Sequence, residues 1–417
     1  MLIRKQSIHL MLISVLLLGA SMNFQAKFFY FAFGLLIVLC IFEKKITYNS
    51  MALVYATVGI LMGLYGLSDG FMAVARRFAY VACYLVGYNV MFLKADYIYN
   101  TTDAVQCQEK RLRLFIAMLA IGSFSHLMLN WINSAGLNLA RNTPDIWSGE
   151  TMSATGQTAI GCLMVGFSCG LILYPRKKIE RLVGTMLALL LFGYNLILSG
   201  RTIIMMYILI FAIGVTFMLK IRCQSSKIIK FIFWIMLLII IFAVAYYNDF
   251  GGIRDTIQSS NLYDRFFGTA IDVDILESGR SERKLEHLFN MYKYPFGGKH
   301  SRAEFGYAHD LLLDAYDEYG VFELMLLIGI LGSSINNLLK LLINKLHSTS
   351  FKISILSMYA AILIQFCLEP IFAGMPWLFV CFCFLNGCVA RLNKVITKAS
   401  NMETKSDRLQ TNNGRVG

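Results

Sequence analysis

The chain alternates long apolar runs with short polar segments over most of its length. An apolar stretch of about 20 residues is long enough to cross the hydrocarbon core of a membrane as a helix. Twelve runs reach or approach this length: 8–22, 28–42, 51–67, 73–93, 114–132, 158–174, 182–198, 203–219, 229–247, 321–342, 353–367 and 373–390. The pattern predicts an all-α polytopic membrane protein with about twelve transmembrane helices.

Composition supports this prediction and excludes an ordinary soluble domain. Of the 417 residues, 57% are hydrophobic and 15% are charged, whereas soluble domains carry about 25% charged residues. The polar residues are too few to cover a globule, so lipid must solvate much of the surface. Most of the ten cysteines lie inside the apolar runs, where we interpret them as small packing residues.

The basic residues predict which ends of the helices face the cytoplasm, because cytoplasmic segments are enriched in Lys and Arg. With the N-terminus inside and the helices alternating, the inner segments hold 25 of the 38 basic residues but only 7 of the 25 acidic ones. We therefore expect both termini in the cytoplasm. The net charge of +13 follows from this asymmetry, and we do not interpret it as a sign of nucleic-acid binding.

The predicted helices leave one long connection, residues 248–308, on the outer side between the ninth and tenth runs. Long loops often carry function. We divide the chain into residues 1–247 with helices one to nine, 248–320 with the outer loop and a re-entering amphipathic helix, 321–398 with helices ten to twelve, and 399–417, a polar tail that we expect to be disordered.

Three of the outer arginines lie at the ends of predicted membrane helices, against the charge rule. Arg201 occupies a tight turn, Ser-Gly-Arg-Thr, between the seventh and eighth runs, and Arg76 and Arg77 begin the fourth run. The simpler interpretation is that these side chains reach for the membrane interface. The alternative is an anion site, because a guanidinium presents a planar, permanently charged fork that matches phosphate oxygens.

The long loop holds two further candidate features. Arg280, Arg283 and His287 are spaced to share one face of a helix, either as a solvated surface paired with nearby glutamates or as a ligand-binding face. Next comes Tyr294-Pro-Phe-Gly297-Gly, a turn sequence whose backbone amides can approach a ligand closely.

His309 immediately precedes a helix that returns to the membrane at the same predicted depth as Arg201. That helix carries Asp310, Asp314 and Asp317 at helical spacing, followed by Glu318. An ionisable cluster at this depth favours a functional site. The carboxylates also allow a divalent metal site, although ion pairs with the loop arginines explain them equally well.

These features occur in an order that resembles the O-antigen polymerase (Wzy) and O-antigen ligase superfamily of bacterial membrane glycosyltransferases. The family pattern is His-Asn, nine residues, Gly, two residues and a small residue. This chain has His309, Asp310, nine residues, Gly320 and then Glu323 at the last position. Asp310 therefore replaces the usual amide and Glu323 the usual small residue. The motifs cover residues 199–202 and 277–323.

The resemblance implies a GT-C-like enzyme of the bacterial cytoplasmic membrane that acts on its outer face. It implies an undecaprenyl-diphosphate-linked oligosaccharide as donor, no metal or other cofactor, and a flippase and a chain-length regulator as partner proteins. By this resemblance, Arg201 binds the diphosphate together with Arg280 or Arg283, and His309 acts as the general base or contacts phosphate. Arg283, Arg76, Arg77, Tyr294, Gly297, Asp310 and Asp314 complete the expected site.

Other functions remain open at this point. A ligase shares the donor with a polymerase and differs in its acceptor, a lipid A-core sugar. A flippase for lipid-linked glycans belongs to a different class, but flippases are expected to show repeated halves and charged residues in the middle of the membrane. This chain shows no internal repeat, and its ionisable residues gather at the outer rim. An adhesion or scaffold protein would leave the outer arginines unexplained.

Overall fold

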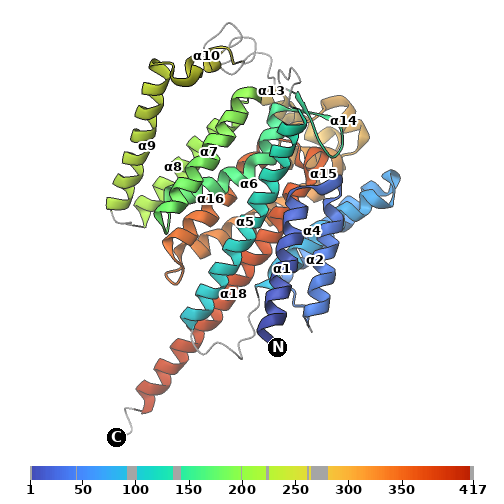
Figure 1. The fold of residues 1–417 in the computed structure, drawn as a ribbon. Coiled ribbons are helices and arrows are strands. Elements are labelled where there is room, and N and C mark those ends of the chain that lie inside the picture. Colours follow the sequence, from blue (N-terminus) through green and yellow to red (C-terminus); the bar gives the residue numbers. More distant parts are fainter. Residues whose placement is uncertain are drawn as a thin grey trace.

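The protein is a bundle of long helices in a computed structural model that describes residues 2–43, 45–91, 101–134, 142–198, 200–221, 225–260, 263 and 280–413 (Figure 1). Each of the twelve apolar runs coincides with one long helix: α1 (Leu2–Ser21), α2 (Phe28–Phe42), α3 (Ser50–Tyr65), α4 (Phe71–Val90), α5 (Thr101–Asn133), α6 (Ala154–Leu173), α7 (Lys178–Leu198), α8 (Thr202–Lys220), α9 (Ser225–Tyr247), α15 (Leu311–Ile343), α16 (Thr349–Phe366) and α18 (Pro376–Asn413).

The length and hydropathy of these helices make the protein a multi-pass membrane protein of the all-α class. Among the described residues, eight helices are long and apolar enough to cross a membrane, namely α5 to α9, α15, α16 and α18. The apolar parts of α1, α2 and α3 are shorter, and α4 carries Arg76 and Arg77. The total of twelve spans therefore stays a prediction.

Short elements connect the long helices. They are η1 (Phe24–Ala26), η2 (Gly66–Asp69), β1 (Asn142–Pro144), β2 (Thr151–Ser153), η4 (Phe250–Gly252), α10 (Ile253–Gln258), α13 (Arg280–Asn290), η5 (Met291–Lys293), α14 (Lys299–Phe305) and α17 (Ile371–Gly374). The strands β1 and β2 pair antiparallel, with Thr143 opposite Met152. Three-residue strands are too short for an alternating pattern to predict them.

The closest helix packing is between α4 and α18. Gly87 and Gly387 lie at their crossing, where a Cβ on Gly87 would collide with the backbone of Phe384 and one on Gly387 with the backbone of Tyr84. Small residues let two membrane helices approach this closely. The glycine pair therefore sets the centre of the bundle.

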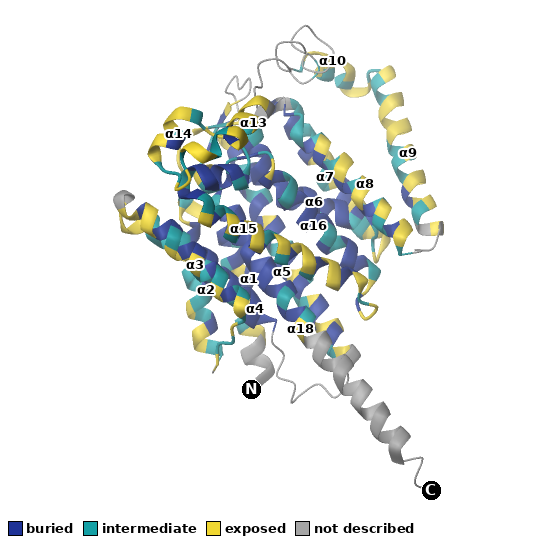
Figure 2. Ribbon diagram, turned by 180° about the vertical axis from the view of Figure 1, so that it is seen from behind, coloured by how far each residue is buried: buried dark blue, intermediate teal, exposed yellow. Residues whose placement is uncertain are grey.

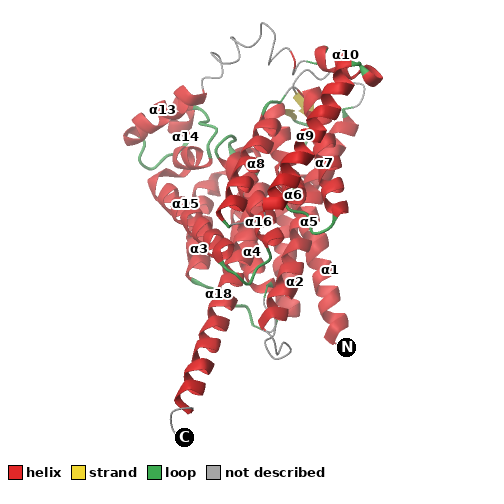
Figure 3. Ribbon diagram, turned by 90° about the vertical axis from the view of Figure 1, so that its left-hand side faces the viewer, coloured by secondary structure: helices red, strands yellow, loops and turns green. Residues whose placement is uncertain are grey.

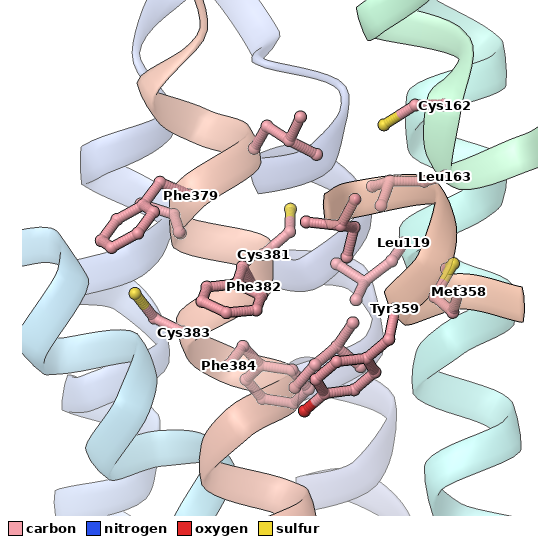
Figure 4. Close-up of a cluster of buried hydrophobic side chains, with 14 of the residues drawn as sticks. Leu119, Cys162, Leu163, Met358, Tyr359, Phe379, Cys381, Phe382, Cys383 and Phe384 are labelled. Atoms are coloured by element: carbon pink, nitrogen blue, oxygen red, sulfur yellow. The ribbon is translucent and has the colours of Figure 1, made fainter. Parts of the chain in front are cut away.

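The core around this crossing is apolar and aromatic. Cys381, Phe382 and Phe384 of α18 pack with Tyr359 of α16 and Leu119 of α5, all at most 1% exposed (Figure 4). The interpretation of the membrane cysteines as packing residues is confirmed for those in this core. Exposed apolar side chains lie instead on the periphery, above all on α9 (Figure 2).

The start of α1 and the end of α18 lie at one end of the bundle, and α10, α13 and α14 lie at the opposite end (Figure 3). This is the arrangement expected if both termini lie on one side of the membrane and the long loop lies on the other. Residues of the tail that the sequence predicts to be disordered extend α18 as a helix to Asn413.

Candidate functional site

The helices of the long loop are fastened to α15 by a buried polar cluster. His287 of α13 places Nδ1 2.5 Å from Oδ2 of Asp317 in α15, and the hydroxyl of Ser301 in α14 donates to Oδ1 at 2.9 Å. All three residues are at most 4% exposed. Burial lowers the pKa of His287, but the hydrogen bond and the charge of Asp317 outweigh burial and raise that pKa above its ordinary value.

The turn before α14 packs against a break in α15. Gly320 interrupts α15 with a φ of 86°, and Gly297 has a φ of 64°, both in the left-handed region that favours glycine. A Cβ on Gly320 would overlap the backbone of Phe296, and the N–H of Val321 donates to the carbonyl of Pro295 at 2.9 Å. The turn therefore packs closely against the backbone of α15. The sequence alone had suggested that its backbone amides approach a ligand.

His309 is held in a left-handed backbone conformation by Asp314. Its φ is 55°, which is unfavourable for a residue with a side chain. The carboxylate of Asp314 accepts the N–H of Ala308 at 2.8 Å and the N–H of Asp310 at 3.0 Å, so it binds the backbone on both sides of His309. Strained residues that are fixed in this way often belong to functional sites.

Asp310 connects this histidine to α13 and α16. Its carboxylate caps α15 by accepting the N–H of Leu312 at 3.0 Å, and it lies 3.4 Å from Nζ of Lys284 in α13. The same Nζ donates to the carbonyl of Cys367 at the end of α16 at 2.6 Å. Lys284 was not among the sequence candidates, and its only signal was its position in the basic segment 280–284.

Arg201 stands at the head of an apolar groove. The groove has a volume of about 630 Å³ and runs between α8, α15 and α16. At one end it is lined by Arg201 and Cys367, and along its length by Met205, Leu209 and Leu363. From Arg201 to Ile213 the lining of α8 extends about 18 Å at 1.5 Å per residue. Met205 and Leu209 are exposed, so in a membrane this groove faces lipid.

A chain of contacts through Cys367, Lys284 and Asp310 links the groove to the segment that holds His309. Cys367 lines the groove beside Arg201, and its carbonyl accepts the hydrogen bond from Lys284, which also contacts Asp310. Arg201 thus lines the groove itself, and Lys284 and the segment of His309 are connected to the groove through Cys367. Such an arrangement suits a ligand with an anionic head and a long hydrocarbon tail.

Arg77 has a different set of partners. Its guanidinium donates to the hydroxyl of Tyr319 at 3.2 Å and lies 3.7 Å from Oε1 of Glu318. Glu318 also pairs with Arg302 of α14, at 3.0 Å. Arg77 therefore connects α4 to the N-terminal part of α15 and, through Glu318, to α14, an arrangement that accounts for Glu318 without a metal.

The remaining residues that the sequence predicted for the site make other contacts or fall outside the described residues. Arg76 stacks over the ring of Phe29 at 5.8 Å, which fits an interfacial anchor. Arg283 is exposed on α13, and the hydroxyl of Tyr294 donates to Glu304 at 2.6 Å. The side chain of Arg280 lies outside the described residues, as do Ser199 and 277–279.

The four carboxylates that could have formed a metal site, from Asp310 to Glu318, are occupied by protein groups. Asp310 caps the helix, Asp314 binds two backbone amides, Asp317 pairs with His287 and Glu318 pairs with two arginines. Within the described ranges, no group of three His, Cys, Asp or Glu side chains is arranged to hold a metal ion.

No model of a known protein family matches the chain, and no curated protein matches it in sequence. The functional interpretation therefore rests on the residues and their geometry.

Proposed function

We propose that this protein is a membrane glycosyltransferase that polymerises polyprenyl-diphosphate-linked oligosaccharide repeat units into a surface polysaccharide at the outer face of a bacterial cytoplasmic membrane. The observation that carries the proposal is the apolar groove lined by Arg201 and Cys367, because the carbonyl of Cys367 binds Lys284, the partner of Asp310 next to His309. A polyprenyl diphosphate has this pattern of one hydrocarbon chain and one anionic head.

The proposed reaction uses these groups as follows. A hydroxyl oxygen of the acceptor sugar attacks the anomeric carbon of the donor glycan, and the bond between that carbon and the diphosphate oxygen breaks. His309 accepts the hydroxyl proton. Arg201 binds the lipid-bound diphosphate, whose charge grows as it leaves, and Lys284 adds a second positive charge at the mouth of the groove. The cations stabilise the leaving group without a required metal.

Asp314 acts in this proposal as a positioning residue. It contacts the backbone on both sides of His309 and so directs the imidazole without touching the substrate. Asp310 has a similar indirect role, because its carboxylate holds Lys284. The family that this chain resembles has an amide at the position of Asp310. In this chain an acid is explained there because Asp310 pairs with Lys284.

The surface glycan of a deletion strain tests the proposal against its alternatives. A polymerase deletion leaves surface glycan of one repeat unit, and the plasmid-borne parent gene restores long chains. Long chains that remain on the polyprenyl carrier would instead identify a ligase. The loss of all repeat units from the outer face would identify a flippase, and unchanged glycan would reject all three.

A further inference from the structure

A second cavity lies at the other end of the bundle from Arg201, where α6 is joined to α7. It has a volume of about 790 Å³ and is lined by residues of that connection, of α7 and of α9. Five of its lining residues are cations: Arg176, Lys177, Lys178, Arg181 and Lys230. Nothing in the proposed glycosyl transfer uses them.

Among the described residues, only one of these cations has an acidic partner. Arg176 pairs with Glu180 at 2.7 Å, four residues away on the same segment. Within the described ranges, no ion pair occupies Lys177, Lys178, Arg181 or Lys230, and Nε of Arg181 donates to the carbonyl of Ile172. The cavity therefore concentrates positive charge beyond what the protein itself neutralises, and like charges this close together repel unless an anion joins them.

The rest of the lining is apolar and aromatic. Leu173, Leu182 and Trp234 line the cavity beside the cations, and the indole N–H of Trp234 donates to the hydroxyl of Thr185 at 3.3 Å, which fixes the ring between α9 and α7. Only 6% of the apolar window of α9 is buried in the protein, and Figures 1 and 2 show α9 standing apart from the bundle. Lipid chains must therefore fill the space beside Trp234.

We propose that this cavity binds the phosphate headgroup of an anionic phospholipid of the inner leaflet, with its acyl chains along Trp234 and the facing surface of α7. Basic pockets between membrane helices on the cytoplasmic side suit such headgroups. A soluble anion would use the cations alone, whereas a phospholipid also uses the apolar wall. The site takes no part in the proposed glycosyl transfer, and only its placement in the inner leaflet rests on the same predicted orientation.

Quenching of Trp234 by brominated lipids tests this site. The purified protein is placed in nanodiscs of phosphatidylcholine that contain increasing fractions of phosphatidylglycerol brominated on its acyl chains. In the comparison series the bromine is carried by phosphatidylcholine and the phosphatidylglycerol is unlabelled. The chain has four tryptophans, so a Trp234→Phe variant isolates the signal of Trp234. We expect saturable quenching at low fractions of brominated phosphatidylglycerol and only proportional quenching by brominated phosphatidylcholine.

Two double variants test whether the cations of the cavity cause the preference for phosphatidylglycerol. Lys178→Gln with Lys230→Gln should weaken the preference for phosphatidylglycerol roughly tenfold or more, since each surface cation adds an appreciable attraction for anionic lipid. Lys340→Gln with Lys345→Gln removes two exposed lysines at the same end of the bundle and should keep the curve of the parent. Equal effects of the two pairs, or equal quenching by both lipids, would overturn the proposal. Loss of the preference in excess inorganic phosphate would overturn it in favour of a soluble anion.

Discussion

His309 combines an unfavourable backbone conformation with a side chain that has the chemistry of a general base. A residue with a Cβ loses about 1 kcal/mol or more in the left-handed region, and the two hydrogen bonds to Asp314 offset this cost. The fold therefore maintains a strained residue at the position where the proposed proton transfer occurs. Folding alone would be served as well or better by glycine.

A pair of substitutions at this residue separates catalysis from structure. His309→Gly relieves the left-handed strain, so its melting temperature should equal or exceed that of His309→Ala, with a difference of about 1 kcal/mol in the free energy of unfolding. Both variants should lose activity. Thermal unfolding in detergent and turnover of a lipid-linked glycan measure the two effects. An alanine variant that is more stable than the glycine variant would contradict the strain argument.

Glu323 is a second unusual residue, because it is 0% exposed and neither carboxyl oxygen makes a hydrogen bond within the described part of the chain. A buried polar group without a partner costs about 1–3 kcal/mol. Sequence comparison with the resembling family singled out this position, but only the structure shows its isolation inside the bundle.

Substitution of Glu323 by an apolar residue of similar size should stabilise the protein. Glu323→Met keeps most of the volume and removes the unpartnered carboxyl group, so unfolding should shift upward by about 1–3 kcal/mol in free energy. Glu323→Gln is the matched control, since it keeps a polar group and should give little gain. Thermal unfolding of the purified variants checks this. A methionine variant less stable than the parent would show that the carboxyl group has a stabilising partner.

At the scale of secondary-structure elements, the position of α13 depends on the buried contact between His287 and Asp317. Helical spacing alone predicted that His287 lies on the same face of α13 as Arg280 and Arg283. The structure instead buries His287 and leaves Arg283 exposed. The difference arises because α14 and α15 supply a serine and an aspartate to one side of α13, and a periodic pattern within α13 carries no information about those neighbours.

This contact should make the docking of α13 sensitive to pH. The pKa of His287 in the folded protein is raised above its ordinary value of about 6.5, so the stabilisation is complete below that value and is lost as pH rises through the folded-state pKa. Asp314 also contributes to the raised pKa. Hydrogen exchange of α13 amides, corrected for the intrinsic pH dependence of exchange, should show less protection at alkaline than at mildly acidic pH.

Two histidine variants provide the controls for this pH effect. His287→Ala should abolish the dependence and loosen α13 by about 3 kcal/mol, because Asp317 then stays buried without its cation. His300→Ala changes an exposed histidine of neighbouring α14 and should behave as the parent does. A pH dependence that persists in His287→Ala would assign it to another group.

At the scale of the whole molecule, hydropathy predicted the positions of all twelve long helices, because a helix that crosses lipid must be apolar over most of its length, and eight of the described helices meet that requirement. Hydropathy could not predict the groove beside Arg201. Its walls come from α8 and from α15 and α16, which lie about a hundred residues further along the chain, and apolar residues that line a groove have the same composition as those that pack in a core.

Cysteine labelling tests the predicted orientation. In a cysteine-free background, cysteines at Ser259 and Lys299, both exposed in the long loop, should react with a membrane-impermeant thiol reagent in intact cells or spheroplasts. Ser301, a natural first choice from sequence, is unsuitable because it is buried against Asp317. A cysteine at Lys345 should react only after the membrane is opened. The reverse pattern would contradict the orientation and the proposed site with it.

The central claim is that Arg201 and His309 form one diphosphate-dependent transfer site, and the turnover of a defined lipid-linked repeat unit by purified protein tests it most directly. The parent should form longer glycans in excess chelator. Arg201→Lys keeps the charge but loses the planar fork, so it should lose most turnover, and His309→Ala should lose roughly a hundredfold. Arg254→Lys, the same change at an exposed arginine of α10, should keep turnover. Near-parent turnover by well-folded Arg201→Lys and His309→Ala proteins would contradict the account.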